Sequence, residues 1–256
     1  RVVQADGTQF WIHDFEFTFG AGASLDIQET NALFRDAFAA VWSGQAENDA
    51  FNRLVLLAGL PWRDVALLRA YARYLKQIRL GFELPYIAST LVAHADIARE
   101  LVRLFRTRFY LARKLSADDL ADMQGKLEKA ILGALDDVAV LNEDRILRRY
   151  LDLIKATLRT NFYQNDDEGE AREYLSLKFD PTQIPELPLP RPMFEIFVYS
   201  PRVEGVHLRG GKVARGGLRW SDREEDYRTE VLGLVKAQQV KNAVICLLYT
   251  SPSPRD

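Results

Sequence analysis

The chain has 256 residues, of which 48% are hydrophobic and 27% are charged, and its formal net charge at pH 7 is −2. A chain of this length and composition can bury a substantial core in one or two domains. The small net charge provides no overall field that favours nucleic acid or an anionic membrane. No apolar run reaches the roughly 18 residues of a membrane-spanning helix. Cys246 is the only cysteine, which excludes a disulfide framework and predicts a cytoplasmic protein.

The first 24 residues indicate the end of a β-containing domain of regulatory type. Residues 9–19, QFWIHDFEFTF, have the aromatic and β-branched composition of a strand. The sequence GAGAS at 20–24 resembles the start of a dinucleotide-binding fingerprint, but Leu25 occupies the position of the third glycine and no βαβ pattern follows. We interpret 20–24 as a loop. The start of the chain has no apolar h-region and no initiator Met, so we expect an internal cut and no signal peptide.

Residues 25–163 have the pattern of a helical bundle domain. Pro61 and Pro85 fit the first position of a helix, where the missing N–H has no cost. Ser116 resembles the first residue of a capping box, and Asn142 is a candidate cap for a later helix. Apolar residues recur at helical spacing in two stretches, which are Leu68, Tyr71, Leu75 and Ile78 in the first and Leu147, Leu151, Ile154 and Leu158 in the second.

Two of the expected helices are rich in arginine, and His94 also lies in an expected helix. Acidic residues accompany most of these cations, so we interpret both helices as solvated faces or inter-domain contacts and rank a nucleic-acid interface last. His94 has no second His or Cys at ligand spacing and is interpreted as a structural or surface residue, so we predict no metal site.

Residues 164–192 are predicted to be an acidic and proline-rich linker. The segment begins with QNDDEGE at 164–170, and DPTQIPELPLPRP at 180–192 contains five prolines. Such a composition favours an extended, semi-rigid connection over the interior of an element. A new domain is therefore expected from residue 193.

Residues 193–245 contain the segment with the strongest chemical signal. Residues 193–200 and 203–209 are predicted strands, and Gly210-Gly211 predicts a hairpin turn because both residues tolerate positive φ. Next comes ARGGLRWSDR at 214–223, in which Gly216-Gly217 lies between two arginines. Glycines in a strand often mark the close approach of a ligand, and a guanidinium can hold a carboxylate through two hydrogen bonds. Spacing alone leaves a substrate site and a β-bulge with surface arginines equally open.

Residues 204–245 resemble the start of the catalytic region of the large NAD-specific glutamate dehydrogenases. The sequences KVARGGLRWSDR, DYRTEVLGL, KAQ and KNAVI occur in that order and at the spacing of the family. Residues 28–163 are similar to the long helical portion of the same family, with less diagnostic motifs. The resemblance thus covers most of the chain up to Ile245.

The resemblance implies oxidative deamination of L-glutamate to 2-oxoglutarate and ammonia, with hydride transfer to NAD. Carried over from the family, the substrate-binding residues are Arg215, Gly216, Gly217 and Lys241. The smaller members of the family have lysine directly before the glycine pair, so Arg215 keeps that role here or Lys212 takes it. Arg219, Asp222 and Arg223 fit the motif, and holding the loop in shape is at least as good an explanation for them as a direct role.

The chain departs from the family after Ile245, where CLLYTSPSPRD replaces the expected strand and the segment with the catalytic lysine. We predict that residues 246–256 are a non-native read-through tail. The catalytic lysine, the catalytic aspartate and the NAD-binding domain are then expected outside this chain, which alone is expected to be inactive.

These observations predict an α+β fold, a helical bundle followed by an incomplete βα substrate-binding domain. The parent protein is expected to be a cytoplasmic, homo-oligomeric enzyme of amino-acid catabolism. The alternative is that the helical region is a regulatory or oligomer-forming module without catalysis of its own. If the helical region packs on residues 193–245 it braces the catalytic region, whereas an independent bundle with an exposed apolar patch indicates a partner surface.

Overall fold

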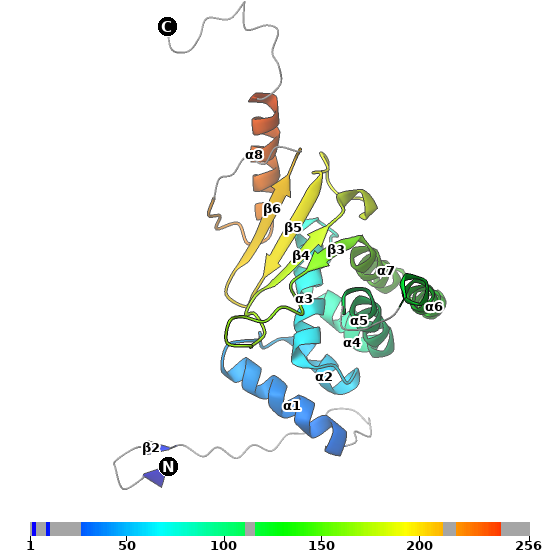
Figure 1. Ribbon diagram of the computed structural model, residues 1–256, viewed down its shortest axis with the longest axis vertical. Helices are drawn as coiled ribbons and strands as arrows, with labels where there is room; N and C mark the ends of the chain where they lie inside the picture. The colour runs from blue at the N-terminus through cyan, green and yellow to red at the C-terminus, as the bar shows by residue number, and fades with distance from the viewer. Residues whose placement is uncertain (1, 4–8, 11–26, 111–115, 212–218, 242–256) are drawn as a thin grey trace, which may run out of the picture.

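The computed structural model describes the backbone of residues 2–3, 9–10, 27–110, 116–211 and 219–241, and the side chains of most of these residues. Its helical part contains seven α-helices and one short 3-10 helix in the described residues (Figure 1). They are α1 Ile27–Trp42, η1 Ala50–Asn52, α2 Arg53–Leu57, α3 Trp62–Gln77, α4 Leu84–Ala93, α5 Ala95–Phe109, α6 Ala117–Asp136 and α7 Leu141–Ala156.

An antiparallel sheet of four strands follows the helices, in the spatial order β3-β4-β5-β6. After the last strand a helix, α8, lies beside β6 at the end of the described chain (Figure 1). The strands are β3 Thr157–Thr160, β4 Leu175–Phe179, β5 Phe194–Tyr199 and β6 Glu204–Arg209, with a 3-10 helix η2 Pro181–Gln183 after β4, and α8 spans Tyr227–Lys241. Near the N-terminus β1 Val2–Val3 and β2 Gln9–Phe10 form a separate antiparallel pair.

One hydrophobic core joins the helices to the sheet. Alternate residues of a strand point to opposite faces, and in β5 the alternation places Phe197 and Tyr199 on the buried face beside Leu177 of β4. Tyr74 of α3 packs on this face, with its ring stacked on Phe179 at a centroid distance of 4.4 Å and tilted against Phe197 at 5.4 Å. The α+β prediction is therefore confirmed. The described helices that join the bundle to the sheet include α3, which packs on β4 and β5, and α7, which contacts β3 and leads directly into it.

Several local predictions for the helices are confirmed. All four residues of the first predicted stripe are buried, three in α3 and Ile78 at its C-cap. Ser116 caps α6, because its hydroxyl oxygen accepts a hydrogen bond from the N–H of Asp119 at 3.1 Å. None of the described helices combines the length and the apolar composition needed to cross a membrane.

Other helix boundaries differ from the prediction. The helix with the second apolar stripe ends at Ala156, and Leu158 lies half-exposed in β3, because the chain there pairs with β4. Asn142 is not a cap, since α7 begins at Leu141 with Val140 as its N-cap residue. Pro61 is the N-cap residue of α3, one position before the predicted place. A backbone N–H at this position would have no partner within the helix, so the missing N–H of proline still has no cost there.

The segment predicted as a linker contains a strand of the sheet. Residues Leu175–Phe179 form β4, which pairs along its whole length with β5 from Leu175 opposite Tyr199 to Phe179 opposite Glu195. The alternation of LSLKF buries Leu175, Leu177 and Phe179, so this part of 164–192 belongs to the core. The proline-rich stretch after it contains only the single turn of η2 in the described residues. The sheet consequently includes strands from both sides of the predicted boundary at 193.

Candidate functional site

The predicted substrate-binding residues lie mainly outside the described part of the chain. Lys212, Arg215, Gly216 and Gly217 fall in residues 212–218, which are not described. Lys241 is the last residue of α8, and only its backbone is described. The structure therefore shows the frame around the predicted site, which consists of β6 before the segment and residues 219–241 after it.

The strand that leads into the segment is the last of the described sheet. β6 pairs with β5 from Phe194 opposite Arg209 to Tyr199 opposite Glu204. These two strands confirm the strands predicted at 193–200 and 203–209. The Nε of Arg209 donates a hydrogen bond to the carbonyl oxygen of Gly211, two residues further along the chain, at 3.0 Å. The chain thus enters the glycine-rich segment from the edge of the described sheet.

The two arginines of the motif that follow the undescribed segment, Arg219 and Arg223, form ion pairs with carboxylates of residues 226–230. Arg219 pairs with Glu230 of α8, and the hydroxyl of Ser221 donates to the other oxygen of Glu230 at 2.7 Å. The hydrogen bond from Ser221, with a smaller effect from Arg219, holds the pKa of Glu230 below its usual range. Arg223 Nε donates to Asp226 at 2.8 Å. These contacts fit the interpretation that Arg219 and Arg223 keep the loop in shape.

A buried ion pair attaches the first turn of α8 to the sheet. Arg228 donates from Nε and Nη2 to the two carboxylate oxygens of Glu195 on β5, at 2.6 and 2.7 Å. The exposed fractions of the two side chains are 1% and 0%. Burial alone lowers the pKa of Arg228, but the hydrogen bonds and charge of Glu195 outweigh it and raise the pKa above its usual value. Both charges are therefore kept inside the core as a bidentate pair.

A second polar cluster surrounds Arg73 of α3. Its guanidinium lies 2.7 Å from Glu47, 3.3 Å from Glu204 of β6 and 3.3 Å from Glu224, while the hydroxyl of Tyr199 donates to Glu47 at 2.7 Å. Burial, opposed by Arg73 and assisted by Glu47, raises the pKa of Glu204 to about 6. One arginine of the helical region thus binds carboxylates from the loop before η1, from β6 and from the turn before α8.

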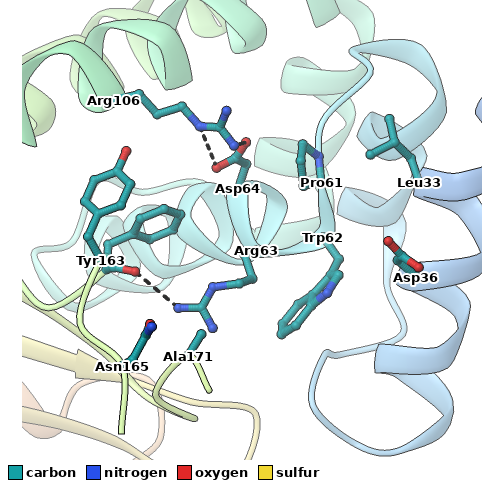
Figure 2. A pocket seen from close by; sticks show the side chains of 11 residues that line it. Leu33, Asp36, Pro61, Trp62, Arg63, Asp64, Arg106, Tyr163, Asn165 and Ala171 are labelled. Carbon is teal, nitrogen blue, oxygen red and sulfur yellow. Dashed lines mark hydrogen bonds and ion pairs between the residues drawn. The ribbon is translucent and has the colours of Figure 1, made fainter. Parts of the chain in front are cut away.

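A cavity of about 350 Å³ opens where the start of α3 meets α1, α5 and the loop after β3 (Figure 2). Its two arginines are both engaged. Arg106 donates to the buried carboxylate of Asp64 at 3.2 and 2.5 Å, and Arg63 donates to the carbonyl oxygen of Phe162 at 3.3 Å. Burial lowers the pKa of Arg63, whose guanidinium lies 5.7 Å from the ring centroid of Trp62. The described lining includes no residue of 204–241, so we do not place the glutamate site in this cavity.

His94 and many cations of the two arginine-rich helices interact with nearby carboxylates. His94 Nε2 lies 2.9 Å from Glu143, between α4 and α5. The basic helices carry ion pairs with nearby carboxylates, among them Arg99–Asp96, Arg103–Glu100, Arg148–Asp144 and Lys155–Glu128. Within the described residues, no group of three or more His, Cys, Asp or Glu side chains is arranged to hold a metal ion.

Two family models match the chain. The model described as the catalytic domain of bacterial NAD-glutamate dehydrogenase matches residues 130–249, and the model of glutamate dehydrogenase helical motif 3 matches residues 46–111. The chain belongs to the bacterial NAD-glutamate dehydrogenase family. The resemblance inferred from residues 204–245 is confirmed. The catalytic-domain match begins well before residue 193, where the sequence predicted the boundary, and extends into the tail predicted as non-native from residue 246.

Curated relatives carry the same family name. The chain is 76% identical over 245 residues to the NAD-specific glutamate dehydrogenase of Pseudomonas aeruginosa, covering 96% of this chain and 15% of the relative. It is 58% identical over 243 residues to that of Halomonas elongata and 48% identical over 250 residues to that of Mycobacterium tuberculosis, each covering 95% of this chain and 15% of the relative. The chain thus spans about 15% of the length of these relatives.

Three residues that the sequence did not single out attach the start of α8 to α3 and to the sheet, namely Gln77, Glu195 and Arg228. Glu195 had a readable signal, because it shares the period-two alternation of Phe197 and Tyr199 in an otherwise apolar strand. Arg228 lies in the motif DYRTEVLGL, but its pairing with Glu195, 33 residues away, has no local signal. Gln77 had no signal, since its partner Arg228 lies 151 residues away in the sequence.

Proposed function

We propose that the protein to which this chain belongs catalyses the oxidative deamination of L-glutamate to 2-oxoglutarate and ammonia, with hydride transfer to NAD. The observation that carries the proposal is the ordered motif of residues 204–245 inside the 130–249 match to a catalytic domain of this name. The names of the relatives support it.

In this proposal residues 212–241 supply one side of the glutamate site. Arg215, or Lys212 in its place, and the ammonium group of Lys241 bind the substrate carboxylates, and Gly216 and Gly217 let the backbone approach the substrate. A guanidinium suits this role because its planar donors match a carboxylate in two parallel hydrogen bonds. The catalytic lysine, the catalytic aspartate and the NAD site are assigned to parts of the protein outside this chain, which alone is proposed to be inactive. A cytoplasmic homo-oligomer is the proposed form of the enzyme.

The packing supports a bracing role for the helical region. Tyr74 stacks on strands β4 and β5, and Arg73 binds Glu204 of β6. Of the two alternatives set by the sequence, this arrangement favours a helical region that supports the catalytic region over an independent regulatory bundle.

Lys241→Ala in the full-length protein tests the proposal. We expect the KM for glutamate to rise about 30-fold or more, since a buried charge that loses its partner costs about 2 kcal/mol or more. The KM for NAD is expected to stay within twofold. The matched control is Lys236→Ala on the same helix, where the side chain is exposed and no change is expected. Equal losses of affinity for glutamate and NAD would indicate a folding defect, and absence of glutamate-dependent NADH formation by the wild-type protein would refute the proposed function.

A further inference from the structure

We propose that Gln77 is a positioning residue for the glutamate site, because it caps α8 from a different helix and so fixes the direction of the helix that ends at Lys241. The inference rests on the function proposed above for Lys241. Gln77 lies in the helical region, within the match to helical motif 3, and the helix that it contacts lies within the match to the catalytic domain.

The side-chain amide of Gln77 binds two backbone groups at the start of α8. Its Nε2 donates to the carbonyl oxygen of Glu224 at 2.7 Å, and its Oε1 accepts from the backbone N–H of Arg228 at 3.1 Å. The residue is 2% exposed. The first N–H groups of an α-helix have no partner within the helix, and a nearby Ser, Thr, Asp or Asn commonly supplies one. Here the acceptor comes from the last residue of α3.

The residue directly before α8 is otherwise engaged. The carboxylate of Asp226 binds Arg223 and lies 3.5 Å from Arg79, whereas the N–H of Arg228 is bonded to Gln77. The same residue, Arg228, carries the side chain that pairs with Glu195. The first turn of α8 is therefore held at its backbone by α3 and at its side chain by β5, which fixes both its place and its direction.

The direction of α8 matters because the proposed substrate contact lies at its far end. The helix has 15 residues and is about 22 Å long. At that length a tilt of roughly 5° at the first turn moves the last residue by about 2 Å. A hydrogen bond from an N–H donor to an oxygen spans about 2.7–3.2 Å, so a displacement of this size breaks the proposed contact between Lys241 and a substrate carboxylate. Loss of the cap should thus raise the KM for glutamate even though Gln77 does not touch the substrate.

The test uses the full-length protein with Gln77→Met, which keeps the side-chain volume and removes both hydrogen bonds. We expect the KM for glutamate to rise about tenfold, with the KM for NAD within twofold of wild type. Gln183→Met makes the same chemical change at an exposed site of η2, and Ile146→Val weakens the core at α7, whereas the main contacts of α8 are with β6 and α3. Neither control is expected to change the KM for glutamate, although Ile146→Val should lower the Tm. An unchanged KM for glutamate in Gln77→Met, or an equal rise for both ligands, would overturn the inference.

Hydrogen–deuterium exchange separates this inference from the proposed function. Gln77→Met should speed exchange in peptides that cover residues 224–237 and leave α5 and α7 at wild-type rates. Unchanged exchange in 224–237 overturns the positioning role, whatever substrate the enzyme uses. A wild-type protein without glutamate-dependent NADH formation refutes the proposed function, and faster exchange in Gln77→Met would then still establish Gln77 as the cap of α8.

Discussion

The pair of Arg228 and Glu195 provides a quantitative test of how α8 is attached to the sheet. Replacing Arg228 by methionine leaves the carboxylate of Glu195 in the core, where it is 0% exposed. Removal of one partner from a buried pair costs about 3–5 kcal/mol. The hydroxyl of Tyr74 lies in the same region, and burial together with the charge of Glu195 raises its pKa well above the usual value. It therefore keeps its proton and can donate to the abandoned carboxylate, so we expect the lower end, about 3 kcal/mol.

A double-mutant cycle measures the pair itself. Glu195→Met alone leaves a buried guanidinium and is also expected to cost about 3 kcal/mol. Replacing both residues by methionine removes both charges and fills a similar volume, which is often neutral or stabilising for such pairs. The double variant should therefore be more stable than either single variant. Equilibrium unfolding in urea, with the slopes checked for constancy, gives the four free energies of unfolding.

Two results would refute this reasoning. A cost below about 1 kcal/mol for Arg228→Met would mean that water reaches Glu195 and that the pair behaves like an exposed one. A double variant as unstable as the sum of the single variants would mean that the two side chains act independently, in spite of the 2.6 and 2.7 Å contacts.

The sequence predicted those elements whose signal is local. The apolar stripe of α3 and the cap of α6 depend on residues three or four apart, and both are present. β4 was missed because five residues between an acidic loop and a run of prolines carry little pattern, and their role is decided by pairing with β5. The end of α7 was misplaced for the same reason, since Leu158 continues the helical spacing but the chain pairs with β4 from Thr157.

The candidate site shows the same division. The motif at 204–245 identified the family and the segment that carries the chemistry, because the order of its residues is specific. The contacts that orient the segment could not be predicted, because they join parts of the chain that are far apart in the sequence. Gln77 binds Glu224 and Arg228, which follow it by 147 and 151 positions. Glu195 offered a sequence signal as a single carboxylate at a buried position of an apolar strand, and Arg228 offered one as part of the motif DYRTEVLGL.

Three further predictions concern local energetics. Ser116→Ala removes the cap of α6 and should destabilise its first turn by about 1 kcal/mol, seen as faster amide exchange there, whereas Ser116→Asp should keep the protection. Phe179→Ala removes the ring stacked on Tyr74 and should lower the free energy of unfolding by about 3–5 kcal/mol. Leu158→Ala changes a half-exposed site and should lower it by less than about 1 kcal/mol. Similar changes in Tm for the two variants would contradict the assignment of β3 and β4. Glu204→Gln tests the carboxyl whose pKa burial raises from 4.5 to about 6. Because the folded protein binds this proton more tightly than the unfolded chain, the stability that the carboxyl contributes is present below pH 4.5 and is lost as the pH rises through 6. The shift corresponds to about 2 kcal/mol, and the side chain is only 15% exposed, so Glu204→Gln should stabilise the fold by up to that amount at pH 8 and by nothing at pH 4. Thermal unfolding across this range measures the difference, and a variant less stable than wild type at pH 8 would show that the attraction of Glu204 to Arg73 exceeds the cost of burying its charge.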